Sequence, residues 1–133
     1  MLRAPRPPER PLKVLRIIDR LNVGGPALHA VLLSARMDPR RVETLLAYGD
    51  VEAGEGDMAY LLDEAPGLRA EKVPGLSREL RPRGDLRALR FLVEMILEEK
   101  PDVVHTHKTK AGLLGRSAAA MCGVPVRVHT YHG

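Results

Sequence analysis

Polar side chains that could take part in chemistry gather at one point of the chain, where an apolar run gives way to small residues. His105 and His107 end the apolar run, and Lys108 and Lys110 follow them directly. Imidazole groups exchange protons near neutral pH, and ammonium groups attract phosphates and carboxylates. The segment from 105 to 110 therefore predicts a binding site for a polar or anionic ligand.

The residues around this segment form a strand, helix, strand unit. Asp102 to His105 is a β-branched run typical of a buried strand, Ala111 to Met121 is a helix of small residues, and Val124 to Thr130 resumes the strand pattern. In an open parallel sheet, ligands bind at the carboxyl ends of the strands, which is where the histidines and lysines fall. The small residues let the helix backbone lie close to the sheet or to a ligand, although tight packing alone would explain them equally well.

A glycine turn near the start of the chain is the second candidate segment. A strand is expected over Lys13–Asp19 and a helix over Pro26–Met37, with Gly24 and Gly25 between them. A loop without side chains before a helix amino end can cradle a phosphate, and proline suits the first helical position. The spacing is not that of a dinucleotide-binding motif, and a Gly-Gly pair is more often only a turn.

The remaining patterns complete an alternation of strands and helices. Strands are expected over Val42–Tyr48 and Leu68–Val73, and helices over Met58–Glu64 and Asp85–Lys100, with Asp85 as N-cap of the last. Such alternation with right-handed crossovers predicts an α/β fold, a Rossmann-like parallel sheet of about five strands in the order 3-2-1-4-5 with helices on both faces. In that order, the crevice opens between the glycine turn and the segment from 105 to 108.

A basic loop is expected at the same edge of the sheet, between the third strand and the long helix. It carries Arg78, Arg81 and Arg83, whose guanidinium groups could bind a phosphate through paired hydrogen bonds. A basic loop is, however, more often only a solvated loop.

The histidines also raise the question of a metal site. His105 and His107 are two residues apart on a strand, and His129 and His132 lie near the end of the next strand. No Asp or Glu accompanies them in the loop, so no metal site is predicted. His29 is interpreted as a packing or surface histidine.

Composition limits the class of protein. With 133 residues, 44% hydrophobic, and a net charge of +4, the chain is one globular domain at most. Its single cysteine, Cys122, excludes an internal disulfide and is interpreted as a small buried hydrophobe. Residues 1–11 are rich in proline and arginine and predict a disordered leader. The lack of a long apolar run favours a cytoplasmic protein, in peripheral contact at most with the inner face of a membrane.

An ordered set of these residues resembles the middle of the first domain of family 4 glycosyltransferases, which are retaining enzymes with the two-domain GT-B architecture. The matching elements are His-x-His, Lys-Ala-Gly, Leu-Gly-Arg, an alanine-rich helix, Gly-Val-Pro and His-Thr-x-His-Gly. They correspond here to His105, His107, Lys110, Ala111, Gly112, Leu114, Gly115, Arg116, Gly123, Val124, Pro125, His129, Thr130, His132 and Gly133.

The resemblance implies transfer of a sugar from a nucleotide-sugar donor to a sugar, lipid-linked or phosphorylated acceptor, with retention at the anomeric carbon. His132 matches the histidine that closes the last strand near the reacting sugar and is the candidate catalytic residue. The candidate substrate-binding residues are Gly24, Gly25, His107, Lys110 and Arg78. Neither a metal nor another cofactor is implied, and no nucleic-acid partner is expected.

In this comparison, residues 12–133 form a partial acceptor-side domain, without the half that holds the nucleotide. The chain is therefore expected to be inactive alone, and its fifth strand is expected to leave an open apolar edge that promotes association. A non-catalytic module that binds a phosphorylated ligand, or one that acts with a partner chain, is the alternative. A metal-dependent hydrolase using His105 and His107 is a more distant third.

Overall fold

Five parallel strands form one sheet in the order β3-β2-β1-β4-β5 in the computed structural model, which describes residues 10–132. The strands are β1 (Leu12–Ile18), β2 (Val42–Tyr48), β3 (Arg69–Lys72), β4 (Val103–His107) and β5 (Val126–Thr130). The helices are α1 (Gly25–Arg36), α2 (Tyr60–Asp63), α3 (Pro82–Glu99) and α4 (Thr109–Met121). The predicted fold class and strand order are confirmed.

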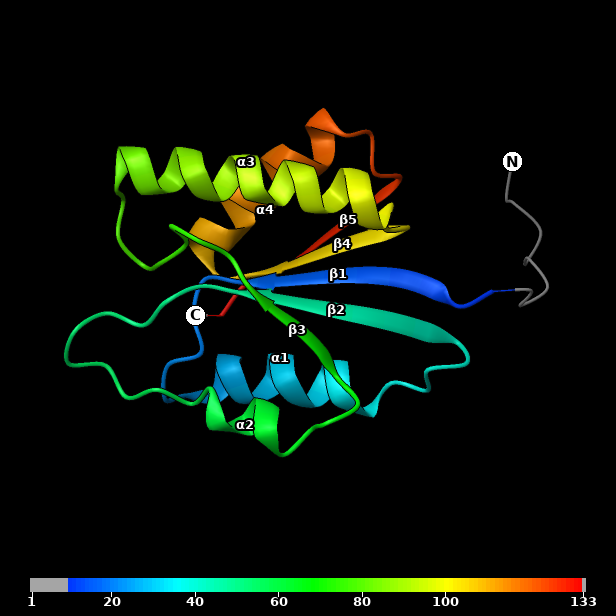
Figure 1. Ribbon diagram of the computed structural model, residues 1–133, viewed down its shortest axis with the longest axis horizontal. Coiled ribbons are helices and arrows are strands. Elements are labelled where there is room, and N and C mark those ends of the chain that lie inside the picture. The colour runs from blue at the N-terminus through cyan, green and yellow to red at the C-terminus, as the bar shows by residue number, and fades with distance from the viewer. Residues whose placement is uncertain (1–9, 133) are drawn as a thin grey trace.

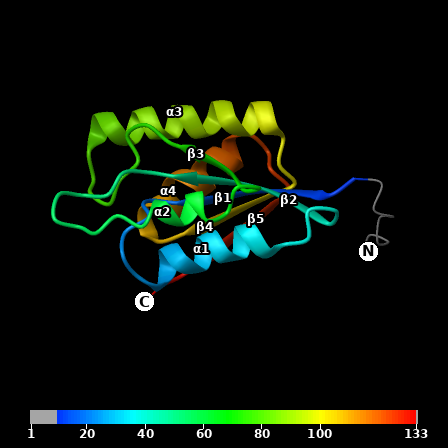
Figure 2. The ribbon, with the colours of Figure 1, turned by 60° about the horizontal axis from the view of Figure 1, so that its bottom comes forward.

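Helices cover both faces of the sheet, as predicted. α3 and α4 lie on one face, and α1 and α2 lie on the other (Figures 1 and 2). Buried residues of β1, β2 and β4 pack with α3 and α4 in one apolar cluster, which includes Leu15, Ile17 and Leu92. A second cluster joins the opposite face to α1 and includes Ile18, Val31 and Leu46. The alternation along β1 thus supplies both cores.

The long helix begins one turn earlier than predicted, so the assignment of Asp85 as its N-cap was wrong. α3 starts at Pro82 after the capping residue Arg81, and the Asp85 carboxylate accepts a hydrogen bond from the Arg81 backbone N–H at 3.2 Å. Proline is favoured in the first helical turn, and Gly84 is tolerated there. The helix ends at Glu99, and its C-cap residue Lys100, directly before Pro101, has a left-handed φ of 50°.

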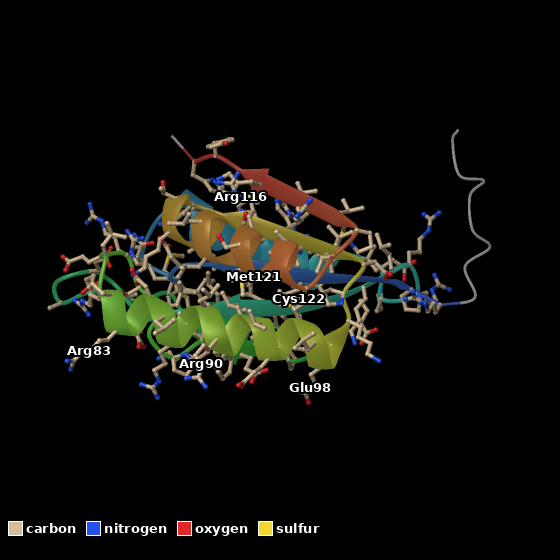
Figure 3. The ribbon with its side chains drawn as sticks, turned by 90° about the horizontal axis from the view of Figure 1, so that it is seen from above. Arg83, Arg90, Glu98, Arg116, Met121 and Cys122 are labelled. Atoms are coloured by element: carbon tan, nitrogen blue, oxygen red, sulfur yellow. The ribbon has the colours of Figure 1, made fainter. Side chains whose placement is uncertain are left out.

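The small residues of α4 bring this helix close against the sheet. A β-carbon on Gly115 would lie 2.5 Å from the Thr106 methyl group, and one on Gly112 would lie 2.4 Å from the His129 ring. The predicted close approach to the sheet is therefore confirmed. Figure 3 shows α3 and α4 side by side on this face, with Arg83, Arg90 and Glu98 on the side of α3 that faces away from α4.

Three further features of the chain bear on the expectations from the sequence. Residues 1–9 of the expected leader lie outside the described residues, whereas Arg10 donates hydrogen bonds to both carboxylate oxygens of Asp102. Cys122 is half-buried and packs against the α3 and α4 cluster (Figure 3). No helix within residues 10–132 has the length and apolarity needed to cross a membrane.

The exposed edge strand β5 leads us to predict that the chain self-associates. Within residues 10–132 it pairs with β4 alone, and Val126 and Val128 are 47% and 42% exposed. Such an edge promotes pairing with another strand. We expect sedimentation velocity to show concentration-dependent oligomers of the chain and Val128→Lys to shift it toward monomer. Leu86→Lys, at an exposed position on α3, should leave association unchanged. A wild-type chain that stays monomeric at every concentration would contradict the expectation.

Candidate functional site

Residues from three neighbouring strands meet at the carboxyl edge of the sheet, around a cavity of about 640 Å³. Asp19 and Arg20 follow β1, Lys108 follows β4, and His132 follows β5. Because β1, β4 and β5 are adjacent and parallel, chain segments separated by more than eighty residues converge here. Arg78, Lys110, His129 and Tyr131 also line the cavity.

The cavity wall carries a carboxylate that the sequence did not single out. Asp19 is buried, and burial raises the pKa of its carboxyl group although Arg20 and Lys108 oppose that shift. The Arg20 guanidinium donates hydrogen bonds to Asp19 at 3.1 Å and to Glu55 at 2.9 Å. This network fixes Arg20, and it leaves Asp19 as a hydrogen-bonding group at the wall of the cavity.

Lys108 connects the cavity with the glycine turn. Its ammonium donates a hydrogen bond to the Asn22 side-chain oxygen at 2.9 Å, and burial lowers the pKa of that ammonium. Gly24 and Gly25 are exposed, and α1 begins at Gly25. The two glycines do not line the cavity itself. Along the chain they follow Asn22, the residue that accepts the hydrogen bond from Lys108.

Lys110 lines the cavity, but its ammonium is held by neighbouring protein groups. This buried side chain forms an ion pair with Asp85 and donates a hydrogen bond to the backbone carbonyl of Glu79. It thereby ties the start of α4 to the loop that carries Arg78, which is exposed. Lys110 therefore fixes the position of one cavity wall against another.

Replacing Lys110 tests this role. We expect Lys110→Met to lower the free energy of unfolding by about 2 kcal/mol, because it leaves the largely buried Asp85 carboxylate without its cation. The double variant Asp85→Asn/Lys110→Met should recover part of that loss. Arg83→Met, at an exposed position on α3, is the control and should change stability by less than about 0.5 kcal/mol. Equal effects of the two single substitutions in urea unfolding would refute the assignment.

Histidines and a buried arginine form a network beneath the cavity. Arg16 donates hydrogen bonds from Nε to His105 Nδ1 at 3.3 Å and from Nη1 to Ser34 Oγ at 3.0 Å. His105 Nε2 lies 2.7 Å from Thr130 Oγ1, and His107 Nδ1 lies 3.0 Å from His132 Nε2. β4 thus holds the end of β5 and the residues beyond it through two imidazole contacts.

The network keeps its imidazoles neutral. Burial, together with the nearby Arg16 charge, lowers the pKa of His105 to about 4, and burial and neighbouring His105 lower the pKa of His107 to about 3. Burial also lowers the pKa of His132, with contributions from His29 and Lys108. Neutral imidazoles can each donate one hydrogen bond and accept another.

The structure thus brings some of the predicted site residues together and separates others. Arg78, Lys110 and His132 border one cavity, whereas His107 lies fully buried behind His132, and Gly24 and Gly25 lie outside the lining. His29, interpreted as a packing or surface histidine, is exposed, and its ring lies 6.0 Å from that of His132. Within residues 10–132, no group of three or more His, Cys, Asp or Glu side chains is arranged to hold a metal ion.

Sequence reasoning missed Asp19 and Arg20 as cavity residues. Both directly follow a strand, as Lys108 does, so the rule that selected the segment from 105 to 110 would also have selected them. Glu55 also pairs with Arg20 and reaches it from a distant loop, so this contact has no local signal in the sequence.

The fold and the cavity together define a class: a Rossmann-like α/β domain with a polar site at the carboxyl ends of its strands. The model of the glycosyl transferase 4-like domain matches residues 24–133 of this chain. The chain therefore belongs to this family of glycosyltransferase domains.

A curated relative gives the comparison in sequence. The chain is 44% identical over 78 residues to the Escherichia coli UDP-Gal:alpha-D-GlcNAc-diphosphoundecaprenol alpha-1,3-galactosyltransferase. The alignment covers 59% of this chain and 20% of that enzyme, so the matched part is a small share of the relative's length.

Solved structures support the fold. MurG from Acinetobacter baumannii superposes with a TM-score of 0.64 at 18% identity, over 90% of this chain and 35% of that one. The UDP-GlcNAc 2-epimerase from Methanocaldococcus jannaschii superposes with a TM-score of 0.59 at 17% identity, over 90% and 31%. Because both a glycosyltransferase and an epimerase share the architecture at such low identity, these likenesses show the fold alone.

Proposed function

We propose that this chain supplies the acceptor-side half of a glycosyltransferase site, in which a sugar passes from a nucleotide-sugar donor to an acceptor with retention at the anomeric carbon. The observation that carries the proposal is the cavity at the carboxyl edge, which combines cationic side chains with the imidazole of His132. Membership of the glycosyl transferase 4-like family supports glycosyl transfer as the reaction class.

The charges of the cavity favour an acceptor that carries phosphate. Arg78 is exposed at the rim, Lys108 is the N-cap residue of α4, and Arg20 is paired with Asp19 and Glu55. A guanidinium binds phosphate oxygens through paired hydrogen bonds, and a helix amino end adds a positive dipole. The name of the Escherichia coli relative describes a diphosphoundecaprenol-linked sugar as its acceptor. A sugar attached to a lipid through a diphosphate is therefore our proposed acceptor class.

Each candidate residue has a role in this proposal. His132 contacts the acceptor or the transferred sugar, Arg78 binds the acceptor phosphate, and Gly24 and Gly25 leave room for a ligand that extends past Lys108. His107 supports His132 from behind, and Lys110 holds the Arg78 loop. The donor nucleotide binds to a second half-site outside this chain, so the chain alone would not catalyse transfer. A lipid-linked acceptor would bring the cytoplasmic protein to the inner face of the membrane.

Calorimetric titration tests the acceptor site. We expect the chain to bind a water-soluble, short-prenyl diphosphate-linked GlcNAc, and Arg78→Ala to weaken binding about tenfold because a charge-assisted contact to phosphate is lost. Arg90→Ala, on the outer side of α3 (Figure 3), is the matched control and should bind normally. Equal affinities of the two variants would refute Arg78 as a phosphate ligand.

The same experiment separates the candidate functions. Addition of a UDP-sugar to the chain and acceptor analogue should give no transfer product, whereas a longer protein that contains this chain and a nucleotide-binding half should give one. Acceptor binding without transfer by that longer protein would instead favour the phospho-ligand binding module. If neither the analogue nor inorganic pyrophosphate binds, the proposal fails.

A further inference from the structure

His107 and His132 form a pair in which one imidazole is fully enclosed and the other borders the cavity. His107 is 0% exposed, and its Nδ1 lies 3.0 Å from Nε2 of His132. The two rings are stacked, with centroids 5.3 Å apart and planes inclined by 23°. Only one proton can occupy the contact between these two nitrogens, so the tautomers of the two residues are linked.

The neighbouring contact shows how such linkage operates. Arg16 Nε is always a donor, so His105 Nδ1 must be the acceptor of that hydrogen bond. The single proton of neutral His105 is therefore on Nε2, from which it is donated to Thr130 Oγ1 at 2.7 Å. A buried cation on β1 thus sets the tautomer of a histidine on β4.

The enclosed Nε2 of His107 determines which residue of the His107–His132 pair donates the hydrogen bond between them. His107 Nε2 is buried and has no hydrogen-bond partner within residues 10–132. A buried N–H group without a partner is costly and rare, whereas a bare acceptor nitrogen is better tolerated. The nearby positive charge of Arg16 also opposes a second proton on this ring, so His107 keeps a single N–H group. The proton of His107 is therefore placed on Nδ1, in the contact with His132.

We propose that His107 is a positioning residue that holds His132 in its Nδ1–H tautomer, so that His132 presents a hydrogen-bond donor to ligands in the cavity. The inference rests on the proposed function only in naming the ligand, a phosphate or hydroxyl oxygen of the acceptor. His107 Nδ1–H donates to His132 Nε2, and the remaining proton of His132 must then be on Nδ1.

The arrangement also explains why His132 is kept neutral. Protonation of His132 at Nε2 would set two N–H groups against each other unless His107 moved its proton to the enclosed Nε2. The charged and titratable groups around the pair act in the same direction: Arg16 from β1, His29 from α1, His105 from β4 and Lys108 from the loop after β4 lower one or both pKa values. His132 is thereby a neutral donor rather than a proton acceptor.

Side-chain ¹⁵N NMR spectroscopy on the chain itself tests the assignment without any activity. Long-range ¹H–¹⁵N correlation separates protonated from bare imidazole nitrogens for each histidine. We expect wild-type His132 to show a protonated Nδ1 and a bare Nε2, and His107 to show the same pattern. A protonated Nε2 on His132 in the wild-type chain at neutral pH would overturn the inference directly, with no variant needed.

A matched pair of substitutions isolates the hydrogen bond from packing. Asparagine and leucine have nearly the same shape, but only asparagine can place an N–H donor near the position of His107 Nδ1. His107→Asn should preserve the Nδ1–H form of His132, whereas His107→Leu should shift it to the Nε2–H form that free histidine side chains favour. An unchanged His132 tautomer in a folded His107→Leu chain would show that His107 does not set it.

Titration of the same samples with inorganic pyrophosphate separates this inference from the proposed function. Absence of any pyrophosphate effect, with the Nδ1–H tautomer present, would leave the positioning role standing and count against the acceptor site. Pyrophosphate binding with the opposite tautomer would support the site and refute the role of His107.

Discussion

Gly49→Ala is expected to lower the free energy of unfolding by about 3 to 5 kcal/mol, a larger loss than most single substitutions cause. A β-carbon at Gly49 would lie 2.1 Å from the Leu76 carbonyl oxygen and 2.3 Å from the Asp19 carbonyl oxygen. Both obstacles are backbone atoms, which cannot rotate away as a side chain can. To fit a methyl group, either the backbone at Gly49 must move away from both carbonyl groups, or the backbone at Leu76 and Asp19 must move.

The position of Gly49 extends this effect to the cavity. Leu76 lies in the segment that leads to Arg78, Asp19 lines the cavity, and the Asp50 N–H donates a hydrogen bond to the same Leu76 carbonyl at 2.8 Å. Any relaxation of the clash separates these two walls. We therefore expect Gly49→Ala to weaken binding of the acceptor analogue even at temperatures where the variant remains folded.

Gly67→Ala is the matched control for this prediction. Gly67 is exposed, and a β-carbon there would meet no atom within 4 Å. Its substitution should change the free energy of unfolding, measured in urea, by less than about 1 kcal/mol. A loss at Gly49 no greater than that at Gly67 would show that the contacts around Leu76 and Asp19 yield without cost.

Local patterns in the sequence were sufficient to predict the order of the strands in the sheet and the position of most helices and strands. Strand and helix periodicities, together with the right-handed crossover rule, lead to the order 3-2-1-4-5, and the topology then locates the crevice. Gly123 directly follows the C-cap residue of α4 and has a φ of 68°, the left-handed conformation in which glycine commonly follows a helix. α3 begins at Pro82 and not at the predicted Asp85, because proline suits the first helical turn and Gly84 is tolerated within it.

The buried charges could not be predicted in the same way. Arg16 stands in the middle of an apolar strand and is only 3% exposed, because it reaches Ser34 on α1 and His105 on β4. Neither partner is near it in sequence, so no local pattern pairs them. The same holds for Lys110 and Asp85, which are also distant in sequence. Because of their ion pair, Lys110 connects two walls of the cavity, whereas the sequence predicted it as a ligand-binding residue.

Acidification from pH 6.5 to pH 5 is expected to destabilise the fold by several kcal/mol. In the folded chain the pKa of His105 is lowered to about 4 and that of His107 to about 3, whereas both are about 6.5 in the unfolded chain. At a pH between the folded and unfolded pKa values, the unfolded chain binds about two more protons than the folded chain. Acidification therefore lowers the free energy of the unfolded chain relative to that of the folded chain. The stability is fully present above pH 6.5 and declines by roughly 2.7 kcal/mol per pH unit below it.

Other groups modify this decline but do not set its direction. The pKa values of His129 and His132 are also lowered, which adds to the loss, whereas the raised pKa of Asp19 acts in the opposite direction. Comparison with a variant isolates the histidine contribution. His107→Asn removes one of the two buried imidazoles, so it should reduce the slope of unfolding free energy against pH by about half.

Urea unfolding at intervals between pH 7 and pH 4.5 measures both slopes. The wild-type chain should lose stability steeply as the pH falls, and the His107→Asn chain should lose it more gradually, even if it is less stable at pH 7. Parallel curves for the two proteins would mean that His107 takes up its proton in the folded chain without cost. The buried imidazole would then have a partner for its second N–H group, and the tautomer assigned to His132 would lose its physical basis.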